Sequence, residues 1–265
     1  IGTGTFMAAL DGSVVNIILP VLRNTFKTDV ASLEWVVTIY LLVVSGLLLT
    51  FGRLGDLKGH KTVYVWGFSI FVLGSIFCGA AWNPTMLIIF RGMQAIGGAM
   101  LASNSPAIVT GNFPPEQRGR AFGLVSTMTY LGLTVGPSLG GWLTQSFGWR
   151  TVFYINVPVG MLALFLSQYF IPKDASIDKS QRFDLPGAII FLAGLTALLL
   201  GLNKGADWGW SSPAVVGFLI VALLLLIMFI QVERRSPTPM LYLNLFRIPL
   251  FSASAANAVL NYICV

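Results

Sequence analysis

Two charged residues stand inside long apolar stretches, and their side chains are the ones best placed to do chemistry. Asp11 is the only acidic residue well inside such a stretch, and Arg91 is the only basic one. A charge at the centre of a bilayer costs about 2.5–3.5 kcal/mol on insertion scales, so such residues usually face a cavity or a partner. A carboxylate there can bind a proton or a cationic substrate. We therefore hypothesise that Asp11 and Arg91 face one cavity and that protonation of Asp11 weakens their attraction.

Both charges also have a plainer interpretation, which the sequence leaves open. Asp11 could be a carboxylate at a helix end near the membrane interface, and Arg91 could extend along its helix to an interface. Gln94 follows Arg91 by three residues, so the two side chains share one face of a helix. Asn16 lies off the face of Asp11 and is expected to form its hydrogen bonds elsewhere within the bundle.

A run of glycines in another apolar stretch predicts close packing of two helices. Gly132, Gly136 and Gly140 are four residues apart and therefore share one helix face. Small residues at this spacing let a second helix approach closely. Pro137, which is followed by Gly141 at the end of the run, would break a helix in water. In a membrane it is tolerated, because neighbouring groups satisfy the freed backbone.

A polar segment, residues 52–61, joins the second and third apolar stretches and is expected to be a loop. Gly52 and Gly59 permit a tight turn. Asp56 can pair with basic residues or cap the N-terminus of a helix, including one in the other half of the protein. Lys61 ends the segment. The segment therefore has the residues needed for a charged contact that forms and breaks.

The elements that position these residues follow from composition. The chain has 265 residues, of which 55% are hydrophobic and 10% charged, with a mean hydropathy of +0.80. A soluble domain normally has about 25% charged residues, so this is a membrane protein of the all-α class. Apolar stretches of about 20 residues can span a bilayer. Eight complete or nearly complete spans and a partial ninth are predicted, at residues 1–21, 33–51, 62–81, 84–109, 119–145, 151–171, 185–203, 213–231 and from 249 onward.

The distribution of basic residues predicts the orientation of the chain. Although the net charge is +6, the basic residues are scattered over short connections, so membrane topology explains them better than a nucleic-acid partner. Most of them fall in one alternate set of connections, which the positive-inside rule places in the cytoplasm together with the N-terminus. We expect a six-helix bundle at 1–171, a linker with two additional spans at 172–248, and the start of a truncated second bundle at 249–265. On this interpretation the chain is an N-terminal fragment.

Several runs together resemble the major facilitator superfamily, in its fourteen-helix drug:proton antiporter branch. The resemblance covers nearly the whole chain. It rests on segment 10–20, which contains Asp11, and segment 91–98, which contains Arg91. The 52–61 connection, the glycine run at 132–141 and the segments 113–121 and 147–160 add to it. The sequence departs from the family pattern at Leu57, His60 and Ala95.

The resemblance implies a function for the residues singled out above. It implies a secondary transporter of the plasma (inner) membrane that exports small amphipathic or cationic compounds in exchange for protons, by alternating access. Asp11, Arg91, Gln94 and Asn16 would belong to the proton-coupling site and substrate cavity. The 52–61 connection would act as a gate. The glycine run would lie against a partner in the absent C-terminal half and seal the outer side against leak.

Other functions stay open at this point. The same fold could serve a dedicated exporter of a metabolite, a siderophore or an amino acid, or a non-transporting membrane sensor or assembly partner. We expect no enzyme, cofactor or metal, because the sequence has no nucleophile–base set, no metal-ligand cluster and no phosphate loop after a strand. The expected partners are the substrates, protons, the lipid bilayer and the rest of the same polypeptide.

Overall fold

The computed structural model describes residues 1–172, 174, 183–236 and 238–264, and the chain divides into two compact units, Ile1–Ser180 and Gln181–Val265. All regular structure of the described residues is helical, which confirms the all-α prediction. The first unit contains α1 (Gly2–Phe26), α2 (Val30–Lys58), α3 (His60–Ala80), α4 (Pro84–Asn112), α5 (Pro115–Phe147), α6 (Thr151–Tyr154) and α7 (Asn156–Phe170). The second contains α8 (Leu185–Trp208), α9 (Pro213–Arg235), the 3-10 helix η1 (Leu243–Arg247) and α10 (Pro249–Cys264).

Seven of the helices in the described part of the chain are long and apolar enough to cross a membrane. They correspond to α1 to α4, to α6 and α7 counted together, and to α8 and α9. The predicted span 119–145 forms the 33-residue helix α5, which is not among the seven. The reason is its composition, since glycine, serine and threonine lower its mean hydropathy. α10, with 16 residues, is also not among the seven.

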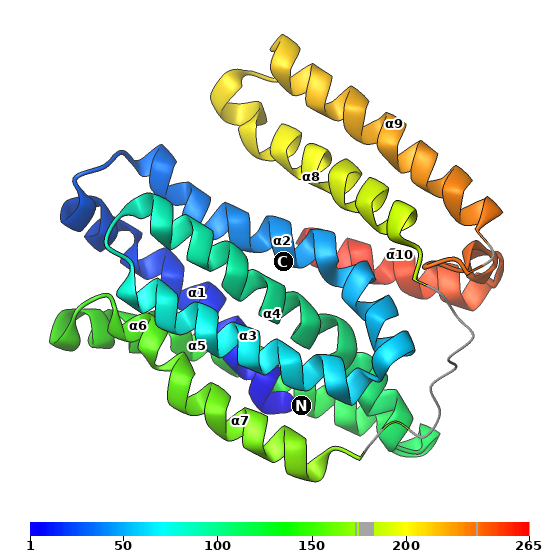
Figure 1. Ribbon diagram of the computed structural model, residues 1–265, viewed down its shortest axis with the longest axis horizontal. Helices are drawn as coiled ribbons and strands as arrows, with labels where there is room; N and C mark the ends of the chain where they lie inside the picture. Colours follow the sequence, from blue (N-terminus) through cyan, green and yellow to red (C-terminus); the bar gives the residue numbers. More distant parts are fainter. Residues whose placement is uncertain (173, 175–182, 237, 265) are drawn as a thin grey trace. The chain divides into compact units, whose positions relative to one another are not determined.

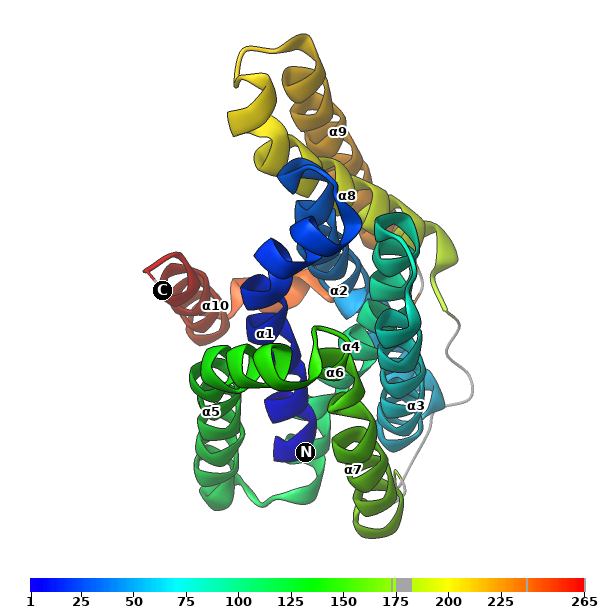
Figure 2. The same cartoon turned by 90° about the vertical axis from the view of Figure 1, so that its left-hand side faces the viewer.

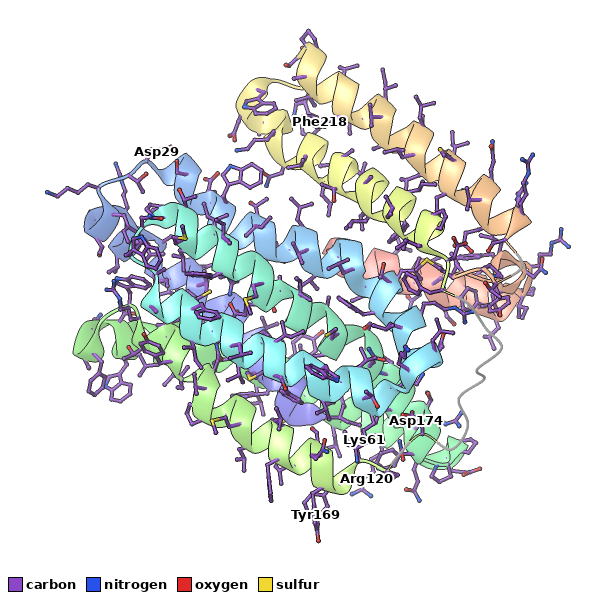
Figure 3. All side chains as sticks on the ribbon, in the orientation of Figure 1. Asp29, Lys61, Arg120, Tyr169, Asp174 and Phe218 are labelled. Atoms are coloured by element: carbon purple, nitrogen blue, oxygen red, sulfur yellow. The ribbon has the colours of Figure 1, made fainter. Side chains whose placement is uncertain are left out.

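Local sequence signals explain where the helices of the first unit begin and end. Asp29 accepts a hydrogen bond from the Ser32 backbone N–H, at 3.2 Å, and caps α2. Asn83 caps α4 in the same way. Gly59 separates α2 from α3 and has φ 94°, a conformation that favours glycine. Figure 3 shows Asp29 and Lys61 at opposite ends of the first unit.

Within the first unit, α1 packs along α5, and α4 packs along both α2 and α3. Figures 1 and 2 show these pairs side by side. The core between the helices consists of fully buried apolar side chains, among them Met7, Phe68, Phe71 and Phe153. α5 continues through Pro137 without a break. The first unit is therefore a helical bundle with an apolar interior, in which any buried charge needs a partner.

In the second unit, α8 and α9 form a hairpin (Figure 1). A Cβ atom added to Gly194 of α8 would lie 3.1 Å from Leu225 Cβ of α9, so the absence of a side chain there permits close packing. The predicted division into residues 1–171, 172–248 and 249–265 stays a prediction, and residues 173, 175–182 and 237 of its middle part lie outside the described residues.

Candidate functional site: a buried ion pair

Asp11 of α1 and Arg91 of α4 form a salt bridge in the interior of the first unit. Asp11 Oδ2 lies 2.6 Å from Arg91 Nη1. Both residues are 1% exposed. A buried pair of this kind is held only when its remaining donors and acceptors are also satisfied.

Three further contacts hold the guanidinium of Arg91. Its Nε donates to the Val36 carbonyl oxygen of α2 at 3.2 Å, and its Nη1 also donates to Gln94 Oε1 at 2.8 Å. The ring of Tyr40 lies below the guanidinium carbon, with 4.2 Å to the ring centroid, a cation–π distance. The position of the positive charge is therefore fixed by α2 and α4 as well as by Asp11.

The second oxygen of Asp11 accepts two amide hydrogen bonds. Gln94 Nε2 donates to Asp11 Oδ1 at 2.9 Å, and Asn156 Nδ2, at the start of α7, donates to the same atom at 2.8 Å. Gln94 Nε2 also lies 2.8 Å from Ser75 Oγ of α3. The carboxylate of α1 thus binds groups from α4 and α7, while Val36 of α2 and Ser75 of α3 bind its partners Arg91 and Gln94. Every contact to that carboxylate comes from a donor, which suits its charged form.

The structure brings together three of the four residues predicted for this site. Asp11, Arg91 and Gln94 are in direct contact, whereas Asn16 is exposed and makes no side-chain hydrogen bond to the described residues. Among the described residues, Asn16 therefore does not form the hydrogen bond that was expected within the bundle. Five positions along a helix correspond to a rotation of about 140° from Asp11, which turns Asn16 away from the bundle interior.

Sequence reasoning missed three members of the site, Asn156, Ser75 and Tyr40. Asn156 is a polar residue within an apolar stretch, and this signal alone could have marked it as a bundle-facing side chain. Nothing comparable distinguishes Ser75 or Tyr40, because serine and tyrosine are common in such helices.

A second polar cluster lies at the end of α2, in the segment 52–61. Asp56 Oδ2 is 3.5 Å from Arg53 Nη1, and Asp56 Oδ1 is 3.3 Å from His60 Nε2. His60 Nδ1 lies 2.8 Å from Asn104 Oδ1 of α4. Arg53 is buried, yet its Nε and Nη2 find no hydrogen-bond partner among the described residues.

The segment 52–61 is not the loop that the sequence predicted. Gly52 lies within α2, and only Gly59, with its positive φ, makes the turn. Gly55, also helical, lets Asn104 and His60 approach, because an added Cβ would clash with both side chains. Lys61 does not reach Asp56 but donates from Nζ to the Gln168 carbonyl, at 2.8 Å, and to the Ile171 carbonyl at the end of α7.

The glycine run packs against α1, which corrects the expectation that it packs against a second bundle. A Cβ added to Gly132 would lie 2.6 Å from the Phe6 carbonyl oxygen. One added to Gly136 would clash with Ser13, and one added to Gly140 would clash with Val14. Pro137 is exposed, and Gly141 has open space where a Cβ would lie.

The run therefore holds α5 against the helix that carries Asp11. Because α1 and α5 already bury this face against each other within the first unit, it is not free for a second bundle.

Comparison with known proteins agrees with this architecture. The sequence profile of the Major Facilitator Superfamily matches residues 1–263. The multidrug resistance protein Stp of Mycobacterium tuberculosis H37Rv is 37% identical over 247 residues, which are 93% of this chain and 46% of that protein. The riboflavin transporter RibZ of Clostridioides difficile is 37% identical over 222 residues, 83% of this chain and 49% of that protein. The chain spans about half the length of the curated relatives it matches.

Among solved structures, the human organic anion transporter MFSD10 (TETRAN) superposes with a TM-score of 0.55 and 16% identity, over 75% of this chain and 54% of that one. At this identity the likeness concerns the fold alone. Helices that can cross a membrane and a profile match over nearly the whole chain define a multi-pass membrane protein with a facilitator-type bundle. The chain belongs to the Major Facilitator Superfamily.

Proposed function

We propose that the full-length protein is a proton-coupled antiporter that exports small amphipathic, often cationic, compounds by alternating access. The observation that carries this proposal is the buried Asp11–Arg91 pair between α1 and α4, which is also bound by groups from α2 and α7. A carboxylate that is buried and surrounded by donors can change its charge only by taking up a proton. Stp, named for multidrug resistance, supports export of several compounds rather than one.

The coupling follows from the contacts of Asp11. Proton uptake removes the negative charge, so the attraction to Arg91 falls from that of an ion pair to that of a hydrogen bond. Gln94 and Asn156 each carry an amide oxygen as well as an amide N–H₂, so each can turn and accept from the protonated acid. The bonds that tie α1 to α4 and α7 then change together, and the helices can move relative to one another. Protons move inward while the substrate moves outward.

The connection between α2 and α3 is the proposed gate, with Gly52, Asp56, Gly59 and Lys61 as its residues. The N-terminus and this connection lie on the cytoplasmic side of the inner membrane, as the distribution of basic residues predicts. The Nε and Nη2 atoms of Arg53, which have no hydrogen-bond partner among the described residues, suit a contact that forms in only one state of the transport cycle. A second six-helix bundle completes the cavity, and no catalytic reaction is part of this function.

RibZ supports a second candidate, a dedicated exporter of one metabolite. The two functions differ in substrate range, since a dedicated exporter would ignore cationic dyes. The fold and the Asp11–Arg91 ion pair are compatible with either function.

The proposed function is tested in inverted vesicles that contain the full-length protein and an imposed proton gradient. Addition of ethidium should dissipate the gradient with the wild type but not with Asp11→Asn. The matched control is Asp29→Asn, the same change at an exposed helix cap where asparagine also caps well. No response from the wild type would favour the dedicated exporter, and a response that survives Asp11→Asn would contradict coupling through Asp11.

A further inference from the structure

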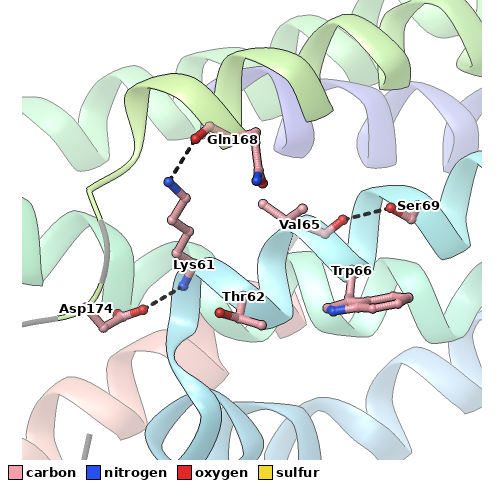
Figure 4. A pocket seen from close by; sticks show the side chains of 7 residues that line it. All are labelled: Lys61, Thr62, Val65, Trp66, Ser69, Gln168 and Asp174. Atoms are coloured by element: carbon pink, nitrogen blue, oxygen red, sulfur yellow. Dashed lines mark hydrogen bonds between the residues drawn. The ribbon is translucent and has the colours of Figure 1, made fainter. Parts of the chain in front are cut away.

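A groove of about 540 Å³ is lined by residues of α3, by Gln168 of α7 and by Asp174, which follows α7. Figure 4 shows the described residues that line it: Lys61, Thr62, Val65, Trp66, Ser69, Gln168 and Asp174. Its volume falls within the range of about 300–1,000 Å³ that is typical of small-molecule sites. The proposed transport mechanism uses none of these residues except Lys61, and it uses Lys61 only at the gate.

The polar groups of the groove gather at the end of α3 where the helix begins. The ammonium of Lys61 donates to the carbonyls of Gln168 and Ile171, which leaves its third N–H for another acceptor. Asp174 does not reach this ammonium but accepts from the backbone N–H of Lys61, at 3.2 Å. The positive charge thus lies between backbone carbonyls, with the Thr62 hydroxyl also in the lining.

Further along the groove, Val65 and Trp66 are apolar, and so is much of the neighbouring surface of α7. The side chain of Trp66 is 61% exposed, and on α7 Phe165, Tyr169 and Phe170 are exposed by 64%, 75% and 69%. Figure 3 shows Tyr169 projecting away from the bundle. α3, and α6 and α7 taken together, are long and apolar enough to cross a membrane, so these surfaces meet lipid. Tryptophan, tyrosine and lysine near a helix end are typical of the depth at which lipid headgroups lie.

We propose that the groove binds one zwitterionic phospholipid of the membrane. Its phosphate accepts hydrogen bonds from the Lys61 ammonium, the Thr62 hydroxyl and the Gln168 amide, while the first part of an acyl chain lies on Val65 and Trp66. The negative charge of Asp174 at the same groove balances that of Lys61, and this favours a zwitterionic headgroup over an anionic one. The lipid would join α3 to α7 at the membrane surface.

The test is native mass spectrometry of the full-length protein, delipidated and titrated with dioleoylphosphatidylcholine. The wild type should retain one tightly bound equivalent. Lys61→Gln should weaken this binding by about tenfold, because a hydrogen bond to a charged group is lost. Since Lys61 also binds the end of α7, a second variant, Ser69→Trp, fills the groove without changing that contact. It should abolish the tight equivalent.

Leu73→Trp is the matched control, one turn further along α3, 47% exposed and outside the groove lining. It should bind the lipid as the wild type does. Three results would overturn the proposal: equal binding by Ser69→Trp and the wild type, equally tight binding of dioleoylglycerol, which lacks the phosphate, or displacement of the lipid by inorganic phosphate at the same concentration.

Discussion

The two polar clusters of the first unit differ in how completely their charges are satisfied. In the interior, Asp11 and Arg91 are almost fully buried, and each has further partners besides the other. At the end of α2, the side chain of Asp56 is 50% exposed, and its contacts to Arg53 and His60 are 3.5 and 3.3 Å long. The interior cluster is buried and its ion pair is short, whereas the cluster at the end of α2 is half-exposed and its ion pairs are longer.

This difference separates two roles. Removing one partner of a buried ion pair strongly destabilises the protein, because the other charge stays buried without a partner. The stability of such a site therefore depends mainly on the charge of its members. A half-exposed pair contributes little to stability and can exchange partners at small cost. The interior cluster therefore suits proton binding, and the cluster at the helix end suits a contact that changes during the transport cycle.

The largest effect is expected from removing one charge of the interior pair. Arg91→Met leaves the buried carboxylate of Asp11 without its cation, and it should lower the free energy of unfolding by about 3–5 kcal/mol. The measurement is the unfolding midpoint of the full-length protein in detergent. The double variant Asp11→Asn/Arg91→Met should recover most of this stability without recovering proton coupling. A single variant as stable as the wild type would show that the pair is hydrated rather than buried.

Loss of one hydrogen bond to the interior carboxylate should have a smaller effect. Asn156→Ala removes the donor from α7 to Asp11 and should cost about 1.5–3 kcal/mol, the range for a hydrogen bond to a charged group. Asn112→Ala is the matched control, since that exposed side chain donates only to the Ile108 carbonyl at 2.8 Å. Equal stability of the two variants would contradict a charged Asp11.

The packing of α5 tests whether the interior cluster depends on the position of α1. Gly136→Leu must displace Ser13 and should destabilise the protein by about 1–3 kcal/mol, as overpacking does. Gly141→Leu, in the same run but facing open space, should leave the unfolding midpoint unchanged. If both variants behave alike, α1 is not the partner of the glycine face.

The smallest effect is expected at the end of α2. His60→Gln removes the contact to the half-exposed carboxylate of Asp56, and it should change the free energy of unfolding by less than about 1 kcal/mol. Transport of ethidium by the same variant should fall if the cluster acts as the gate. A stability loss greater than that of Asn156→Ala would reverse the comparison between the two clusters.

Much of the fold could be predicted from the sequence, because its signals are local. Runs of apolar residues as long as a bilayer is thick predicted the helices, and the single charges Asp11 and Arg91 marked the site. The predicted span 119–145 also forms a helix, α5, but this helix is less apolar than the seven that could cross a membrane. Where the sequence predicted a loop at 52–61, α2 continues to Lys58, since only Gly59 interrupts the helix.

The sequence by itself determined the class of the protein, the two charges within apolar stretches and the helix face on which each glycine lies. Only the tertiary structure decided which helix each face meets, because the period of a helix fixes direction but not neighbours. Thus Asn156, 145 positions from Asp11, binds it, whereas Asn16, five positions away, does not. In the same way, the glycine face of α5 packs against α1. The faces of both helices are then buried within the first unit, and neither needs a second bundle to cover it.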